Sequence, residues 1–314
     1  MACCALAGPP VEVTYLGVSG WVVRRGGAVV LTAPLFSNPS FLETGLGATT
    51  ADSARIDGAL ATLGADLSAV SLLLSGHGHY DHLMDVPHVM RAHAPAATLL
   101  LNRTSAHQIA PESLGGRSIV VDDSAATADR VGGWITLGSV RVMPLRSAHA
   151  PQFAGVRLFR GDRDRDMSEL PATAHEWLDG RSHAYLIDFM EGGRSAFRVY
   201  YQDAVAEEPM GFVPEALLWP QDPTARPVDL ALLVPSTYPE VAFHPEALID
   251  HLRPRHVLLG HWEDFWRPPT ADPKPLAIND FGHFIGRLEN ALGAIGAPRD
   301  AWHMPVAGAR FEFR

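Results

Sequence analysis

The sequence predicts an α/β protein in which two β-sheets pack face to face and helices cover their outer sides. Strand-like and helix-like runs occur in a similar order twice, over residues 11–122 and 134–295, although no sequence repeat is visible. The 314-residue chain is 47% hydrophobic and 19% charged, which is ordinary for a soluble protein with a sizeable core. We therefore expect residues 11–314 to form a single domain, preceded by a tail at residues 1–10.

The first half opens at residues 11–16 with the alternation of a half-buried strand. Residues 21–23 and 28–31 flank the turn Arg24-Arg25-Gly26-Gly27 and predict a hairpin. The remaining expected elements are a helix at 54–63, a strand at 70–74, a helix at 85–94 that Asp85 could cap, a strand at 97–101, a helix at 105–113 and a strand at 118–121.

The second half changes to hairpins. Strands are expected at 134–137 with 140–145 and at 183–189 with 195–201. A strand at 229–234, a helix at 245–252, a strand at 255–260, a helix at 281–295 and a closing strand at 309–313 complete the pattern. The charged segment 153–182 is expected to be a solvated loop, or else a lid or specificity insertion beside the site.

A dense cluster of metal-ligand residues follows the apolar run 70–74. His77, His79, Asp81 and His82 fall within six residues, and glycines flank the first histidine. Imidazole and carboxylate groups suit zinc, iron or manganese. On a turn, His77 and His79 can point one way while Asp81 and His82 point another, so one stretch could serve two ions. The alternative is a polar surface loop that is rich in histidine, but this pattern after a buried strand favours metal binding.

The motif His77-Gly-His79-Tyr-Asp81-His82 resembles the signature of the metallo-β-lactamase superfamily of metal-dependent hydrolases. Its H-Y-D-H-L form resembles the branch that holds ascorbate-6-phosphate lactonases and N-acyl-phosphatidylethanolamine phospholipases D. The resemblance implies a four-layer αββα sandwich with the site at one edge between the sheets. It also implies three more ligands at the ends of later strands.

His149 follows the strand 140–145 and fits the third histidine of the first ion. His175 and His183 compete for this role, but no strand precedes His175, and His183 opens a strand instead of closing one. His88 and His93, on the helix 85–94, are assigned to the helix surface or to a core contact.

Asp203 closes the strand 195–201, where the family supplies the carboxylate that bridges both ions, and His261 closes the strand 255–260 as the last histidine of the second ion. The residues around Asp203 depart from the family pattern, which has Gly before this position and Thr or Ser after it. Two more departures are Ala33, where the family often has Asp, and Val18, where it often has His. Both positions concern groups that orient ligands rather than ligands themselves.

The resemblance thus implies two divalent ions, with zinc expected and manganese or iron as alternatives. His77, His79 and His149 would bind one ion, Asp81, His82 and His261 the other, and Asp203 would bridge them. Paired ions about 3.5–4 Å apart can share a hydroxide that attacks a phosphodiester or a lactone or ester, so Asp81 and Asp203 count as catalytic carboxylates. Side chains next to ligands could line a substrate pocket or simply pack beneath the loops: Tyr80, Trp262, Phe265 and Trp266.

Composition limits the partners. A net charge of -10 argues against nucleic acid and anionic membranes, so we expect a small-molecule or lipid-like substrate. Neighbouring Cys3 and Cys4 are the only cysteines and are not expected to form a disulfide. No run is long enough to span a membrane. Residues 1–8 lack a basic region, which favours a cytoplasmic protein, with export as the alternative if they are the remnant of a signal.

Two other functions are compatible with these residues. The same fold with iron hosts redox chemistry in some relatives, so an iron-dependent redox enzyme is one alternative. A non-catalytic metal-binding protein is another, although the complete ligand set argues against it.

Overall fold

Two seven-stranded sheets form the centre of the computed structural model, which describes residues 8–219, 225–277 and 279–314. The first sheet has the order β14 (Arg310–Phe313), β1 (Val11–Gly17), β2 (Gly20–Arg25), β3 (Ala28–Thr32), β4 (Leu72–Leu74), β5 (Thr98–Leu101) and β6 (Ser118–Val120). The second has the order β13 (Trp302–His303), β12 (His256–Leu259), β11 (Leu230–Leu233), β10 (Arg194–Tyr201), β9 (His183–Glu191), β8 (Val140–Arg146) and β7 (Ile135–Leu137).

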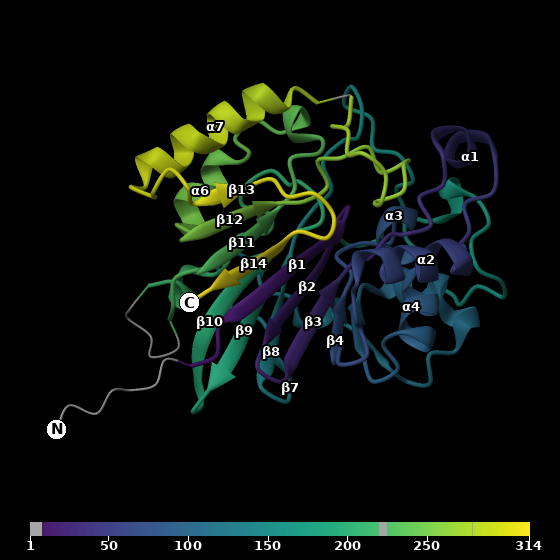
Figure 1. Cartoon of the computed structure of the whole chain (residues 1–314), viewed down its shortest axis with the longest axis horizontal. Helices are drawn as coiled ribbons and strands as arrows, with labels where there is room; N and C mark the ends of the chain where they lie inside the picture. Colours follow the sequence, from purple (N-terminus) through teal and green to yellow (C-terminus); the bar gives the residue numbers. More distant parts are fainter. Residues whose placement is uncertain (1–7, 220–224, 278) are drawn as a thin grey trace.

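Helices lie outside both sheets (Figure 1). On the outer side of the first sheet lie α2 (Ser53–Leu63), α3 (Tyr80–Leu83), α4 (Val86–Ala92) and α5 (Arg103–Gln108). Over the second lie α6 (Glu246–Leu252) and α7 (Phe281–Ala294). The short helix α1 (Phe41–Leu46) buries none of its residues. The expected αββα sandwich is confirmed.

Alternation along the strands builds the layers. In β4, Leu72 and Leu74 point into the core between the sheets, whereas Leu73 packs under the outer helices together with Ile56 of α2 and Val89 of α4. Successive side chains of a strand point to opposite faces, so an apolar run serves both faces at once. This explains why the buried strands read as continuous apolar runs.

Several local predictions need correction. Helix α1 and strand β13 were not among the elements expected from the sequence. Asp85 occupies the N-cap position of α4, but its side chain makes no cap hydrogen bond. Its buried carboxylate instead accepts hydrogen bonds from the backbone N–H groups of Phe36 and Ser37, at 2.6 and 2.8 Å, and from the Ser37 hydroxyl at 2.6 Å. A carboxylate buried this deeply takes the donors of the facing loop, which stabilises the chain after β3.

Residues 153–182 contain one 3-10 turn, Ala174–Glu176, but no α-helix and no strand of either sheet. The segment is nevertheless joined to the domain through buried Asp179. The Asp179 backbone carbonyl accepts hydrogen bonds from Gly78 N–H at 3.0 Å and from Asn102 Nδ2 at 2.9 Å. Its carboxylate accepts hydrogen bonds from Gly161 N–H at 2.9 Å and from Arg157 at 2.8 Å, within the segment itself. Its role as a lid or specificity insertion stays a prediction.

None of the helices within the described residues is long and apolar enough to cross a membrane. The expectations for Cys3, Cys4 and the possible signal remnant fall almost entirely on residues 1–7, outside the described part of the chain.

Candidate metal centre

The ligand cluster leaves the carboxyl end of β4, which pairs in parallel with β3 and β5 inside the first sheet. Two glycines, Gly76 and Gly78, allow the backbone of this loop to pass close to neighbouring residues. A Cβ atom at Gly76 would lie 2.6 Å from the carboxylate carbon of Asp203, and one at Gly78 would lie 2.8 Å from Gln108 Nε2. The Gly78 N–H donates to the carbonyl of Asp179 at 3.0 Å, and its carbonyl accepts from Gln108 at 3.0 Å. The loop is therefore fixed from two sides.

Asp81 and His82 are not on a turn, as the sequence analysis expected, but on α3, a single helical turn. It forms because the backbone N–H groups of His82 and Leu83 both donate to the carbonyl of His79 at 3.0 Å. The two pairs of ligands still diverge, since His77 and His79 precede the helical turn and the other pair lies on it.

The first group of candidate ligands is His77, His79 and His149. His77 Nε2 lies 3.1 Å from His79 Nδ1, and the ring of His149 lies 4.8 Å from that of His77. One ligand atom from each residue falls within a common distance of 4.8 Å. His149, just past β8, directs Nδ1 to the carbonyl of Ala150 at 2.6 Å, which leaves Nε2 as its nitrogen for a ligand. Three imidazoles facing one another with no carboxylate among them fit a shared cation.

The second group is Asp81, His82 and His261. Asp81 Oδ2 lies 3.2 Å from Nε2 of His82 and 3.2 Å from Nε2 of His261. His261 follows β12, so this group joins the two sheets at the same edge as the first. A carboxylate with two imidazoles is a donor set that zinc, manganese and iron all accept.

Asp203, directly after β10, lies behind both groups. Its carboxylate accepts a hydrogen bond from Gly76 N–H at 2.7 Å and lies 3.0 Å from His77 Nδ1 and 3.6 Å from His82 Nδ1. Both histidines face the other ligands of their groups through Nε2 instead. Asp203 is thus placed to orient both rings, as carboxylates behind metal-binding histidines commonly do. Its predicted bridging role stays a prediction.

Burial and neighbouring charges give most of the candidate ligands the protonation state that metal binding needs. His82 is the exception, because the carboxylates of Asp81 and Asp203 outweigh its burial and raise its pKa. Burial beside His77 lowers the pKa of His79 well below its ordinary value and the pKa of His149 to about 3. Burial opposes ionisation of Asp203, but the charges of His77 and His82 outweigh it and lower the pKa to about 2. Neutral imidazoles and ionised carboxylates are the forms that bind metals.

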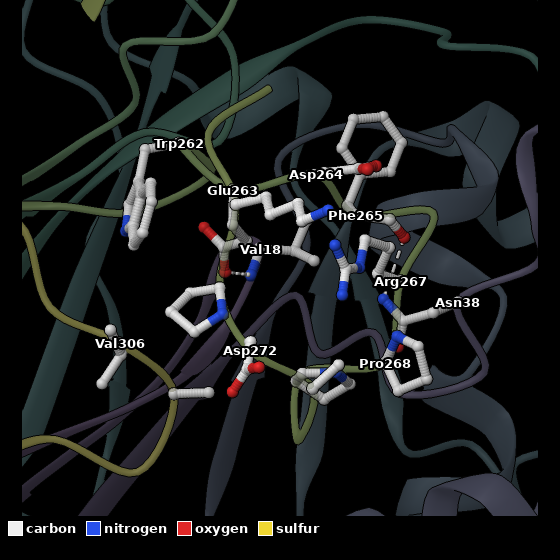
Figure 2. A pocket seen from close by; sticks show the side chains of 15 residues that line it. Val18, Asn38, Trp262, Glu263, Asp264, Phe265, Arg267, Pro268, Asp272 and Val306 are labelled. Atoms are coloured by element: carbon white, nitrogen blue, oxygen red, sulfur yellow. Dashed lines mark hydrogen bonds between the residues drawn. The ribbon is translucent and has the colours of Figure 1, made fainter. Parts of the chain in front are cut away.

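A buried network holds His261 in place, and the sequence analysis missed it. His261 and Val18 both have left-handed backbones, with φ of 53° and 54°, and His261 N–H donates to the Val18 carbonyl at 2.5 Å. The Glu263 carboxylate accepts a hydrogen bond from Val18 N–H at 2.8 Å (Figure 2). It also accepts one from the Tyr15 hydroxyl at 2.6 Å. The sequence offered one signal for this network. Glu263 follows the predicted ligand His261 by two positions, and Val18 stands where the family often has a histidine.

The four aromatic candidates separate into two pairs. Tyr80 and Trp262 are only 4% and 5% exposed, and the Trp262 indole donates to a backbone carbonyl at 2.8 Å, so both pack inside the protein. The ring of Phe265 lies 4.9 Å from that of His261, with Trp266 4.7 Å beyond it. The structure therefore leaves Phe265 and Trp266 as candidates for substrate contact.

Of the competing histidines, neither His175 nor His183 joins a ligand group. His183 is buried beside the loop and its N–H donates to the Gly76 carbonyl at 2.8 Å. Ala33, which stands where the family often has Asp, is fully buried. Its backbone N–H donates to the Leu74 carbonyl at 2.8 Å and so continues the pairing of β3 with β4.

No family model matches the chain. It is 29% identical over 149 residues to a UPF0173 metal-dependent hydrolase of Anaeromyxobacter dehalogenans, a match that covers 46% of this chain and 44% of the relative.

Solved structures match over nearly the whole chain. The metallo-β-lactamase fold protein YhfI of Bacillus subtilis has a TM-score of 0.53 at 11% identity, over 96% of this chain and 99% of that one. CmlA of Streptomyces venezuelae, a diiron β-hydroxylase, has a TM-score of 0.52 at 13% identity, over 98% of this chain and 54% of that one. At such identities these likenesses concern the fold.

Proposed function

We propose that this chain, which has the metallo-β-lactamase fold, is a metal-dependent hydrolase with a centre for two divalent ions. One observation carries the proposal: seven ligand side chains from four separate parts of the chain converge at the ends of β4, β8, β10 and β12. The partial match to a metal-dependent hydrolase supports the same activity.

The two groups divide the ions between them. His77, His79 and His149 would hold one, and Asp81, His82 and His261 the other, with zinc as the proposed metal and manganese or iron as alternatives. Bound divalent ions act as Lewis acids and lower the pKa of water towards about 7, which supplies a nucleophile at neutral pH. Asp203 has two candidate roles, between the ions or behind the histidines, and its contacts to Nδ1 of His77 and His82 favour the second.

The surroundings indicate how a substrate would reach the centre. Among the seven ligands only His149 is partly exposed, so the opening lies on its side. The segment that follows carries exposed apolar side chains at Phe153 and Val156, which are 66% and 53% exposed, and the ring of Phe159 lies 6.0 Å from that of His79. Exposed apolar groups in the segment that follows His149 favour a small-molecule or lipid-like substrate with an apolar part. Its reactive group would be a phosphodiester or a lactone or ester.

The test is hydrolysis of a chromogenic phosphodiester and of a panel of lactones by zinc- or manganese-loaded protein. Asp81→Asn should abolish turnover, because it removes the charge that faces both His82 and His261, whereas exposed Asp272→Asn should leave it unchanged. Diester turnover would indicate a phosphodiesterase, and lactone turnover a lactonase. Bound metal with no turnover of either class would contradict the proposed hydrolase and favour the redox candidate.

A redox enzyme is the second candidate, because the diiron β-hydroxylase with the same fold shows that the fold accommodates such chemistry, and histidine and carboxylate ligands also suit iron. Iron-loaded protein that consumes O₂ while the zinc-loaded form hydrolyses nothing would favour this candidate over hydrolysis.

A further inference from the structure

A second group of metal-ligand side chains lies on the outer helical layer. Asp57 is on α2, His88 is within α4, and His93 follows the end of α4. His88 Nε2 lies 2.9 Å and His93 Nε2 2.7 Å from the same atom, Asp57 Oδ1. One ligand atom from each of the three lies within 4.8 Å of the others. The helices are held together beneath this group by Ile56 and Val89 in the outer core.

The geometry suits a metal ion better than a surface hydrogen bond. A single carboxylate oxygen facing two imidazole nitrogens offers a converging set of donors of the types that first-row metals bind. With metal–ligand distances of about 2.0–2.2 Å the donor atoms would separate by only a few tenths of an ångström. The side chains can make that shift, since those of Asp57, His88 and His93 are 54%, 21% and 28% exposed. Hydrogen bonds from the two histidines also lower the pKa of Asp57, which keeps it ionised.

A comparison within the same chain shows what is special here. His107 also pairs with an exposed carboxylate, with Nδ1 2.7 Å from Asp166 Oδ1, but no second histidine joins that pair. One imidazole and one carboxylate make an ordinary exposed contact, which contributes little to stability.

We propose that Asp57, His88 and His93 form a peripheral site for a divalent transition-metal ion such as Zn²⁺, separate from the candidate metal centre. Two imidazoles and a carboxylate would fill three positions, and water would fill the rest. An ion held there joins α2 to α4 and therefore stabilises the outer layer of the fold.

The experiment is equilibrium dialysis of the full chain against buffered Zn²⁺, with bound zinc counted by elemental analysis. At free zinc that saturates the wild type, His88→Gln and His93→Gln should each lose one bound equivalent, whereas the matched control His107→Gln should lose none. Thermal unfolding gives a second readout: wild type and variants should melt alike in chelator, and only the wild type and control should gain the full zinc-induced shift. Equal zinc counts in wild type and the His88 and His93 variants would overturn the proposal. Neither measurement depends on catalytic turnover.

Discussion

Replacing Asp203 by Asn tests how the two candidate ion sites are held. Asp203 makes one hydrogen bond to Gly76 N–H at 2.7 Å and faces Nδ1 of His77 and His82 at 3.0 and 3.6 Å. An amide keeps the shape but has one acceptor oxygen, so at least one of these donors loses its partner. Residues that orient metal-binding histidines typically contribute 10–100-fold in metal affinity. That corresponds to about 1.4–2.8 kcal/mol.

The assay is competition for zinc against a chromophoric chelator, in a background that carries His88→Gln and His93→Gln so that only the main centre is measured. Asp203→Asn should weaken binding of both ions by a factor of about 10–100, while exposed Asp272→Asn should not change it. Unchanged affinity would refute the orienting role. Loss of one ion at all zinc concentrations would instead identify Asp203 as a bridging ligand.

Three further changes test the structure around the site. Gly76→Ala should cost about 3 kcal/mol of unfolding free energy in denaturant titrations, because the added Cβ would overlap the buried carboxylate of Asp203. The control Gly27→Ala, whose Cβ would have no atom within 4 Å, should change it little. Equal midpoints for the two variants would contradict the packing. Tyr15→Phe should cost about 1–3 kcal/mol, because it removes the donor to Glu263 at 2.6 Å, and an unchanged urea midpoint would argue against the network. Burial lowers the pKa of His244 from 6.5 to about 4, so His244 by itself should remove about 3 kcal/mol of unfolding free energy from the metal-free protein as pH falls through this window, because the unfolded chain takes up the proton first. His244→Gln should remove this part of the pH dependence, and equal slopes for both proteins would contradict it.

The fold was predictable because central strands such as β4 and β11 are apolar runs, outer strands such as β1 alternate between apolar and polar residues, and the ligands follow strand ends. The run 70–74 contains β4, and the residues after β4, β8, β10 and β12 are those predicted as ligands. β4 is followed by four candidate ligands, and β8, β10 and β12 are followed by one each. This order along the chain, together with the family resemblance, predicted that the ligands converge at one edge.

Other features depend on contacts that no local pattern reveals. The position of Asp85 at the start of α4 suggested a helix cap, but its carboxylate accepts a hydrogen bond from the backbone of Ser37, 48 residues earlier. Glu263 contacts Tyr15, 248 residues away, and only the folded chain places them together. The sequence predicted only a surface position or a core contact for His88 and His93, because their partner, Asp57, lies on another helix.

Zinc-dependent hydrolysis tests the central proposal most directly. In the His88→Gln, His93→Gln background, the protein should bind two zinc ions and hydrolyse either the chromogenic phosphodiester or a lactone. His77→Ala, which removes a member of the first group, should lose both an ion and the activity. Zinc binding at two equivalents with no hydrolysis of either substrate class would contradict a metallohydrolase and favour iron-dependent chemistry on the same fold.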